Sequence, residues 1–283
     1  MEHPLKFLKL NYSPFSACQV SGPICQRLSY TDKNGIAQPL DISPHIPFHS
    51  SHICPESGKL RFSAPQDPHV IGGIQDANKH SPLCIPTDEY PIPDGTSEDY
   101  LFLDIYSPTQ AYSASKPLLV FVCILGGGYN ENSDANYNGT GLIQASNMGI
   151  VLVTFNYRVR PYGFLASAEV VEDGIRIIAQ KIRSRSWNGC NNISGRLFGG
   201  DPNHVVVRGS NAGAGFITLL LLTAYGGRND GLFHATAAGS QSFAATNTIN
   251  QSQFAYDNLV IRTSCARSTN TLNCLRNLDA GTL

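Results

Sequence analysis

Short runs of consecutive apolar residues recur between positions 100 and 210. Three of them, 118–125 (LLVFVCIL), 150–157 (IVLVTFNY) and 204–208 (HVVVR), are too short for long helices and rich in β-forming residues. Runs of this kind are typical of strands buried on both faces. Residues 101–106 (LFLDIY) predict one more strand. This part of the chain is therefore expected to build a buried sheet.

Helical patterns lie between and after these strands. Residues 140–148 predict a short helix, and residues 212–225 (AGAGFITLLLLTAY) a longer one that is apolar nearly all round. A helix without a polar face is normally buried. Strands that alternate with helices predict an α/β architecture with a mostly parallel central sheet and flanking helices. Residues 1–95, rich in Pro, His and Ser, predict short strands, turns and long loops.

Composition narrows the function classes. Of the 283 residues only 14% are charged, and the net charge is −1, so no electrostatic feature points to nucleic acid or an acidic membrane as a partner. No apolar run approaches the roughly 20 residues of a membrane helix. The first 20 residues lack the continuous apolar stretch of a signal peptide. The chain as written is expected in the cytosol, and its localisation is otherwise open.

The eight cysteines include no C-x-x-C pair, so a metal site is not expected. Cys265 and Cys274 bound a short polar loop. Such a pair predicts a local disulfide in an oxidising compartment. The alternative is two reduced cysteines in the core.

Three consecutive glycines end the first buried run. Gly126, Gly127 and Gly128 let backbone N–H groups approach a ligand closely and point at a developing negative charge. The alternative interpretation is a flexible turn, which glycines also favour.

A second glycine pattern joins the run at 204–208 to the long apolar helix. In Gly209-Ser210-Asn211-Ala212-Gly213 the glycines stand two before and two after a central residue. This is the spacing of the nucleophile elbow Gly-x-Ser-x-Gly, a strained strand-to-helix turn that exposes its central side chain. Asn tolerates the positive φ of such a turn. A neutral amide, however, is not a nucleophile for covalent catalysis.

Together these motifs resemble the type-B carboxylesterase/lipase family, the cholinesterase-like α/β-hydrolases. The motif sequences are most similar to those of fungal members. The resemblance rests on residues 59–62 (KLRF) with Pro65, 97–106 (SEDYLFLDIY), 126–129 (GGGY), 155–165 (FNYRVRPYGFL), 198–207 (FGGDPNHVVV) and 225–228 (YGGR). It implies the N-terminal portion of an α/β-hydrolase domain over residues 57–283, preceded by a poorly matching segment, 1–56.

The resemblance also implies a Ser/Glu/His esterase mechanism acting on a small carboxylic ester, with no cofactor and no metal. Asn211 then occupies the nucleophile position, with the serine lost. The oxyanion donors correspond to the N–H groups of Gly127, Gly128 and Ala212. Because the family's acid and histidine follow beyond this length, the chain is expected to be truncated and catalytically inactive.

Other departures from the family pattern concern single residues and one segment. Tyr100 replaces a family cysteine, which leaves Cys84 without its usual disulfide partner. His234 falls in a family strand and is expected to be structural. Residues 175–196 stand where the family has a long helix but carry different residues. A shifted reading frame would restore a sequence similar to the family's ALxWVQ segment, which suggests two compensating frameshifts.

Three hypotheses follow from the sequence. The first is a carboxylic ester hydrolase by descent that is inactive in this form. The second is a non-catalytic, cholinesterase-like binding protein, since an α/β-hydrolase surface needs no triad to bind. The third is the product of a degraded gene or a faulty gene model, without activity.

Overall fold

The computed structural model describes residues 9–13, 27–31, 37–38, 46–48, 58–63, 73–76, 80–86, 91–108, 111, 115–132, 137–173, 198–219, 233–242 and 247–283. For the strands that precede residue 77, the description concerns the backbone. Residues 175–196, for which frameshifts were suggested, lie outside the described residues.

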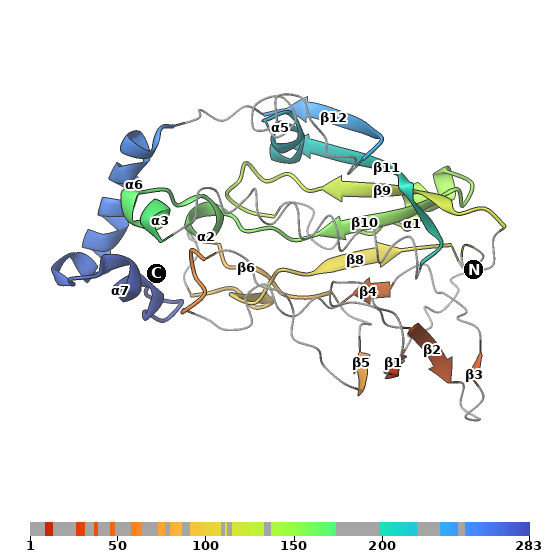
Figure 1. Cartoon of the computed structure of the whole chain (residues 1–283), viewed down its shortest axis with the longest axis horizontal. Helices are drawn as coiled ribbons and strands as arrows, with labels where there is room; N and C mark the ends of the chain where they lie inside the picture. Colours follow the sequence, from red (N-terminus) through yellow and green to blue (C-terminus); the bar gives the residue numbers. More distant parts are fainter. Residues whose placement is uncertain are drawn as a thin grey trace.

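A six-stranded sheet forms the centre of the molecule, in the order β12-β11-β9-β10-β8-β4 (Figure 1). Its strands are β4 (Ile46–Phe48), β8 (Leu103–Tyr106), β9 (Leu118–Ile124), β10 (Ile150–Phe155), β11 (Gly200–Asn211) and β12 (Ala235–Gln241). The four strands from β12 to β10 are parallel, whereas β8 runs antiparallel to both β10 and β4. The predicted strands are thus confirmed, and β11 is longer than expected.

Two smaller sheets come from the first hundred residues. One has the order β3-β2-β1-β5 and is antiparallel, and the other is the parallel pair β6-β7. Their strands are β1 (Lys9–Ser13), β2 (Arg27–Thr31), β3 (Ala37–Gln38), β5 (Gly73–Asp76), β6 (Leu83–Cys84) and β7 (Thr96–Ser97). The strands are short, as the Pro- and Ser-rich composition of this region predicts.

The described helices flank the central sheet or lie beyond the carboxyl ends of its parallel strands. They are α1 (Thr140–Ala145), α2 (Arg160–Phe164), α3 (Ala168–Glu172), α5 (Ala212–Leu219), α6 (Ile249–Arg262) and α7 (Thr271–Arg276). Figure 1 shows α6 and α7 beside α3, past the end of the sheet, and α5 directly after β11. In the described part of the chain, each helix falls short of the length and apolarity needed to span a bilayer.

The central strands β9 and β10 are covered on both faces, which explains their unbroken apolar runs. Val122 and Val153 belong to one core cluster, which Ile217 of α5 joins. Their chain neighbours Cys123 and Leu152 point to the opposite face and pack with Ile143 of α1. Because successive strand residues face opposite sides of a sheet, burial of both faces requires apolar residues at every position.

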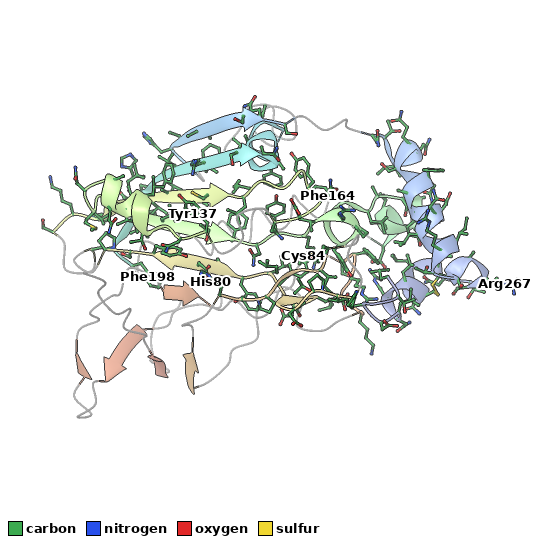
Figure 2. All side chains as sticks on the ribbon, turned by 180° about the vertical axis from the view of Figure 1, so that it is seen from behind. His80, Cys84, Tyr137, Phe164, Phe198 and Arg267 are labelled. Atoms are coloured by element: carbon green, nitrogen blue, oxygen red, sulfur yellow. A yellow bond between two sulfur atoms is a disulfide. The ribbon has the colours of Figure 1, made fainter. Side chains whose placement is uncertain are left out.

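The C-terminal helices form a second core with the segment 58–63. Tyr256 and Leu275 are buried there against Phe62, which is fully inaccessible to solvent. Cys265 and Cys274 are joined by the expected disulfide, which ties a short 3-10 helix (Cys265–Arg267) to α7. Arg267, labelled in Figure 2, marks the loop that this disulfide encloses.

Candidate active site

The glycine-flanked Asn211 lies in a tight turn between a strand and a helix. β11 ends at Asn211 and α5 begins at Ala212, with Asn211 at a φ of 53°. A Cβ on Gly209 would lie 2.4 Å from the carbonyl carbon of Gly213, and one on Gly213 would lie 2.2 Å from the carbonyl oxygen of Ile124. Real Cβ atoms do not approach backbone this closely, so both flanking positions require glycine.

The three-glycine loop reaches this turn because β9 and β11 are neighbouring parallel strands, with Ile124 opposite Gly209. The carboxyl ends of both strands therefore meet at one edge of the sheet. Past β9 the backbone turns through positive φ at Gly127 (113°) and Gly128 (60°). The carbonyl oxygen of Gly127 accepts hydrogen bonds from the N–H groups of Asn130 (2.9 Å) and Glu131 (3.1 Å), which closes the loop.

The loop and the turn meet at a single oxygen atom. Oδ1 of Asn211 accepts a hydrogen bond from the Gly128 N–H at 3.0 Å and another from the Ala212 N–H at 2.7 Å. Gly128 and Asn211 are 83 residues apart in the chain. Two of the three N–H groups expected as oxyanion donors thus point at one site, whereas Gly127 contributes its carbonyl oxygen to the loop.

The loop is held from behind by side chains of the neighbouring segment. Tyr157 Oη lies 2.9 Å from the carbonyl oxygen of Leu125 and 3.0 Å from that of Gly126, and it donates to them. Burial, with the nearby Tyr129 as a smaller cause, raises the pKa of Tyr157, so this phenol remains a donor at neutral pH. The Tyr129 ring contacts the ring of Phe164 edge-on, with centroids 5.1 Å apart. The two N–H donors are therefore positioned by the scaffold around them.

The described histidines lie away from this turn. His204 within β11 and His234 just before β12 contact each other, with ring centroids 5.0 Å apart. His204 precedes Asn211 by seven positions along β11, a distance of about 23 Å. The His80 imidazole lies 2.6 Å from the Asp104 carboxylate on β8, three strands from β11. Among the described residues, then, the turn has no histidine positioned as its base.

Two other sequence expectations can be placed in the structure. Cys84 is a buried thiol in a cluster with Tyr100, the residue that replaces the family cysteine. The Cys265–Cys274 disulfide lies among the C-terminal helices, in the loop that Arg267 marks in Figure 2. The part of the chain that the structure describes contains no cluster of three or more metal-ligating side chains.

Sequence reasoning missed the second role of Asn211. The sequence marks this residue only as a lost nucleophile, yet its side chain bridges two backbone donors. The only local signal was that Asn tolerates the positive φ of this turn, which fits its φ of 53°. The contribution of Gly128 could not be found in that way, since it depends on the pairing of β9 with β11.

The mostly parallel sheet, its flanking helices and the strand-turn-helix at Asn211 define an α/β-hydrolase fold. The crystal structure of Aspergillus niger EstA superposes on the chain with a TM-score of 0.79 and 38% sequence identity, covering 91% of this chain and 48% of that one. Residues 51–283 match the carboxylesterase family. The chain belongs to that family.

Three further relatives include two that are named as hydrolases. Fumonisin B1 esterase of Sphingopyxis macrogoltabida is 37% identical over 62% of this chain, and secreted lipase 1 of Botryotinia fuckeliana is 33% identical over 66% of it. Neuroligin-2 of Mus musculus is 27% identical over 80% of the chain. The chain spans 32%, 33% and 31% of the lengths of these three proteins.

Proposed function

We propose that this chain is a carboxylic ester hydrolase by descent that does not hydrolyse esters in this form. Asn211 occupies the nucleophile position of the family, and the N–H groups of Gly127, Gly128 and Ala212 correspond to its oxyanion donors. The observation that carries the proposal is an asparagine, not a serine, in the glycine-flanked turn at φ 53°. A carboxamide cannot form the acyl-enzyme on which the esterase mechanism depends.

The second support is that no histidine of the described residues lies near Asn211 as its base. Ester hydrolysis by this mechanism needs a histidine within hydrogen-bond reach of the nucleophile and an acid that orients it. His80, the described histidine paired with a carboxylate, is committed to Asp104 on β8. Three strand spacings separate β8 from β11, which is about 14 Å. The substrate of an active form would be a small-molecule carboxylic ester, with no cofactor.

An aryl-ester assay tests this proposal. The unmodified chain is expected to release aryl alcohol no faster than buffer does. Asn211→Ser is expected to stay within residual catalysis, because restoring one triad member does not restore the other two. Ser210→Ala, next to the turn, is the control and should match the unmodified chain. Saturable turnover by the unmodified chain that Ser210→Ala retains would overturn the proposal.

A non-catalytic binding protein is the second candidate, and the same residue favours it. Binding requires a complementary surface and no catalytic triad, so Asn211 in place of serine does not impair a binding function. Neuroligin-2, a relative whose name is not that of a hydrolase, matches 80% of this chain at 27% identity. Capture of one specific partner from the native source by the tagged chain, and not by a heat-unfolded sample, would favour this role.

The degraded-gene hypothesis is tested at the level of the transcript. An intact, in-frame transcript across residues 175–196, with the same amino-acid sequence in close relatives, would contradict the compensating frameshifts. The transcript could instead encode the family's sequence in this segment and serine at position 211. That result would assign this chain to a faulty gene model.

A further inference from the structure

The side-chain oxygen of Asn211 lies where two backbone N–H groups converge. The N–H groups of Gly128 and Ala212 donate to it at 3.0 and 2.7 Å. Donor distances of about 2.7–3.1 Å are those expected for an oxyanion hole. A carboxamide oxygen is an sp² acceptor with two lone pairs, like the carbonyl oxygen of an ester. The two N–H donors are therefore in place for an oxyanion hole. The Asn211 carboxamide oxygen, an acceptor of the same kind as an ester carbonyl oxygen, already occupies it.

The hole does not depend on Asn211 for its shape. Gly128 is held by the bonds to the Gly127 carbonyl and by the Tyr157 phenol behind Leu125 and Gly126. The Arg160 N–H donates to the carbonyl oxygen of Tyr129 at 2.9 Å, which fixes the far side of the loop. Ala212 is the first residue of α5, whose position is set by the close contact of Gly213 with Ile124. Removal of the Asn211 carboxamide should leave two oriented donors.

We propose that Asn211 is an internal ligand of a retained carbonyl-binding site, and that it excludes acyl ligands from that site. This inference rests on the proposed function, because it takes Gly128 and Ala212 as the family's oxyanion donors. The substitution of serine has then changed two properties of the site. It removed the nucleophile, and it placed a tethered competitor, at high effective concentration, in the hole that an ester carbonyl or a carboxylate would occupy.

Hydrogen exchange by mass spectrometry tests the internal ligand. Asn211→Gly removes the carboxamide and suits the positive φ, so the turn should be kept. Amide exchange at Gly128 and Ala212 is expected to accelerate at least tenfold. Asn147→Gly is the matched control, because Asn147 also has a positive φ (54°) but lies in the turn after α1; it should leave both amides as they are. Unchanged exchange at Gly128 in Asn211→Gly would overturn the proposal.

Butyrate is the probe for the vacated site. Asn211→Gly is expected to bind it at least tenfold more tightly than the unmodified chain, with exchange at Gly128 and Ala212 slowed again by the ligand. Asn211→Asp retains an oxygen in the hole and should bind butyrate no better than the unmodified chain. Equal butyrate affinity in the unmodified chain and Asn211→Gly would contradict the proposal. Neither readout measures ester turnover, so failure here is distinguishable from failure of the proposed function.

Discussion

The space available for a Cβ atom differs sharply between two glycines of this chain. At Gly213 a Cβ would meet the carbonyl oxygens of Ile124 and Leu125 at 2.2 and 2.9 Å, whereas at Gly141 in α1 it would meet nothing within 4 Å. Gly213→Ala is expected to lower the free energy of unfolding by about 1–3 kcal/mol through overpacking. Gly141→Ala, its control, should raise it by about 0.5–1 kcal/mol because alanine loses less backbone entropy. Urea unfolding of both variants measures the difference, and equal effects would contradict the steric argument.

The carboxyl group of Asp99 predicts a pH-dependent stability. Burial raises its pKa from 3.8 to about 6, and its Oδ1 atom is buried with no hydrogen-bond partner in the described part of the chain. Below about pH 4 the carboxyl is neutral in both states. As the pH rises towards 6 it ionises first in the unfolded chain, so this group progressively destabilises the fold. The destabilisation is complete above pH 6.

Asp99→Asn should therefore stabilise the protein at pH 7 and flatten the fall in stability between pH 4 and 6. A two-unit shift corresponds to at most about 3 kcal/mol, and partial exposure reduces the expected gain to about 1 kcal/mol. Thermal unfolding across this pH range measures it. Asp94→Asn, which removes an exposed carboxylate from the same segment, is the control and should keep the original slope. The same slope in Asp99→Asn would rule out Asp99 as the source.

At the scale of elements, one arginine joins three segments that are distant in the chain. Arg61 contacts both carboxylate oxygens of Glu98, with Nη2 to Oε2 at 2.9 Å, and both side chains are less than 10% exposed. Its Nη1 donates to the carbonyl oxygens of Leu275 (3.0 Å) and Leu278 (2.6 Å), at the end of α7. The C-terminal helices are thereby fastened to the segments 58–63 and 97–99.

Arg61→Ala is expected to cost about 3–5 kcal/mol of stability, because it leaves the Glu98 carboxylate buried and unpaired. Arg61→Lys should recover only part of this loss, since an ammonium cannot make the bidentate contact. Arg267→Ala removes an exposed arginine at the outer end of the same helices and should change stability by less than about 0.5 kcal/mol. Chemical unfolding compares the three variants. A loss for Arg61→Ala no larger than for Arg267→Ala would contradict this role.

At the scale of the molecule, β12 forms one edge of the central sheet, with no further described strand beside it. All seven residues of β12 are exposed, although β12 is parallel to β11. Parallel strands are normally covered on both faces, and an exposed edge can pair with another chain. Phe254 and Ile261 add apolar surface, being 75% and 64% exposed on one side of α6. These exposed surfaces favour self-association.

The purified chain is accordingly expected to self-associate as its concentration rises. Ala237→Lys places a charge in the middle of β12 and should reduce association, as charges on natural edge strands do. Ala145→Lys adds the same charge to an exposed position of α1 and should have little effect. Sedimentation velocity over a concentration series separates the two. A monodisperse monomer at every concentration, in all three proteins, would contradict the prediction.

Much of this architecture could be predicted from the amino-acid sequence alone. The runs at 118–125 and 150–157 identify β9 and β10 because a strand covered on both faces cannot alternate polar with apolar residues. The helix predicted over 140–148 is confirmed as the shorter α1. The start of the helix predicted over 212–225 is confirmed by α5, whereas residues 220–225 lie outside the described part of the chain. The anchoring by Arg61 had no local signal, because its partners lie 37 and more than 210 positions away.

The sequence by itself determined the buried sheet, the strand-to-helix turn at Asn211 and the absence of a serine there, because each depends on residues adjacent in the chain. Only the tertiary structure decided what the Asn211 side chain does. Its contact with Gly128 exists because β9 and β11 pair in one register, which brings together residues 83 positions apart. Local patterns specify elements, whereas the pairing of distant elements specifies which donors and acceptors meet.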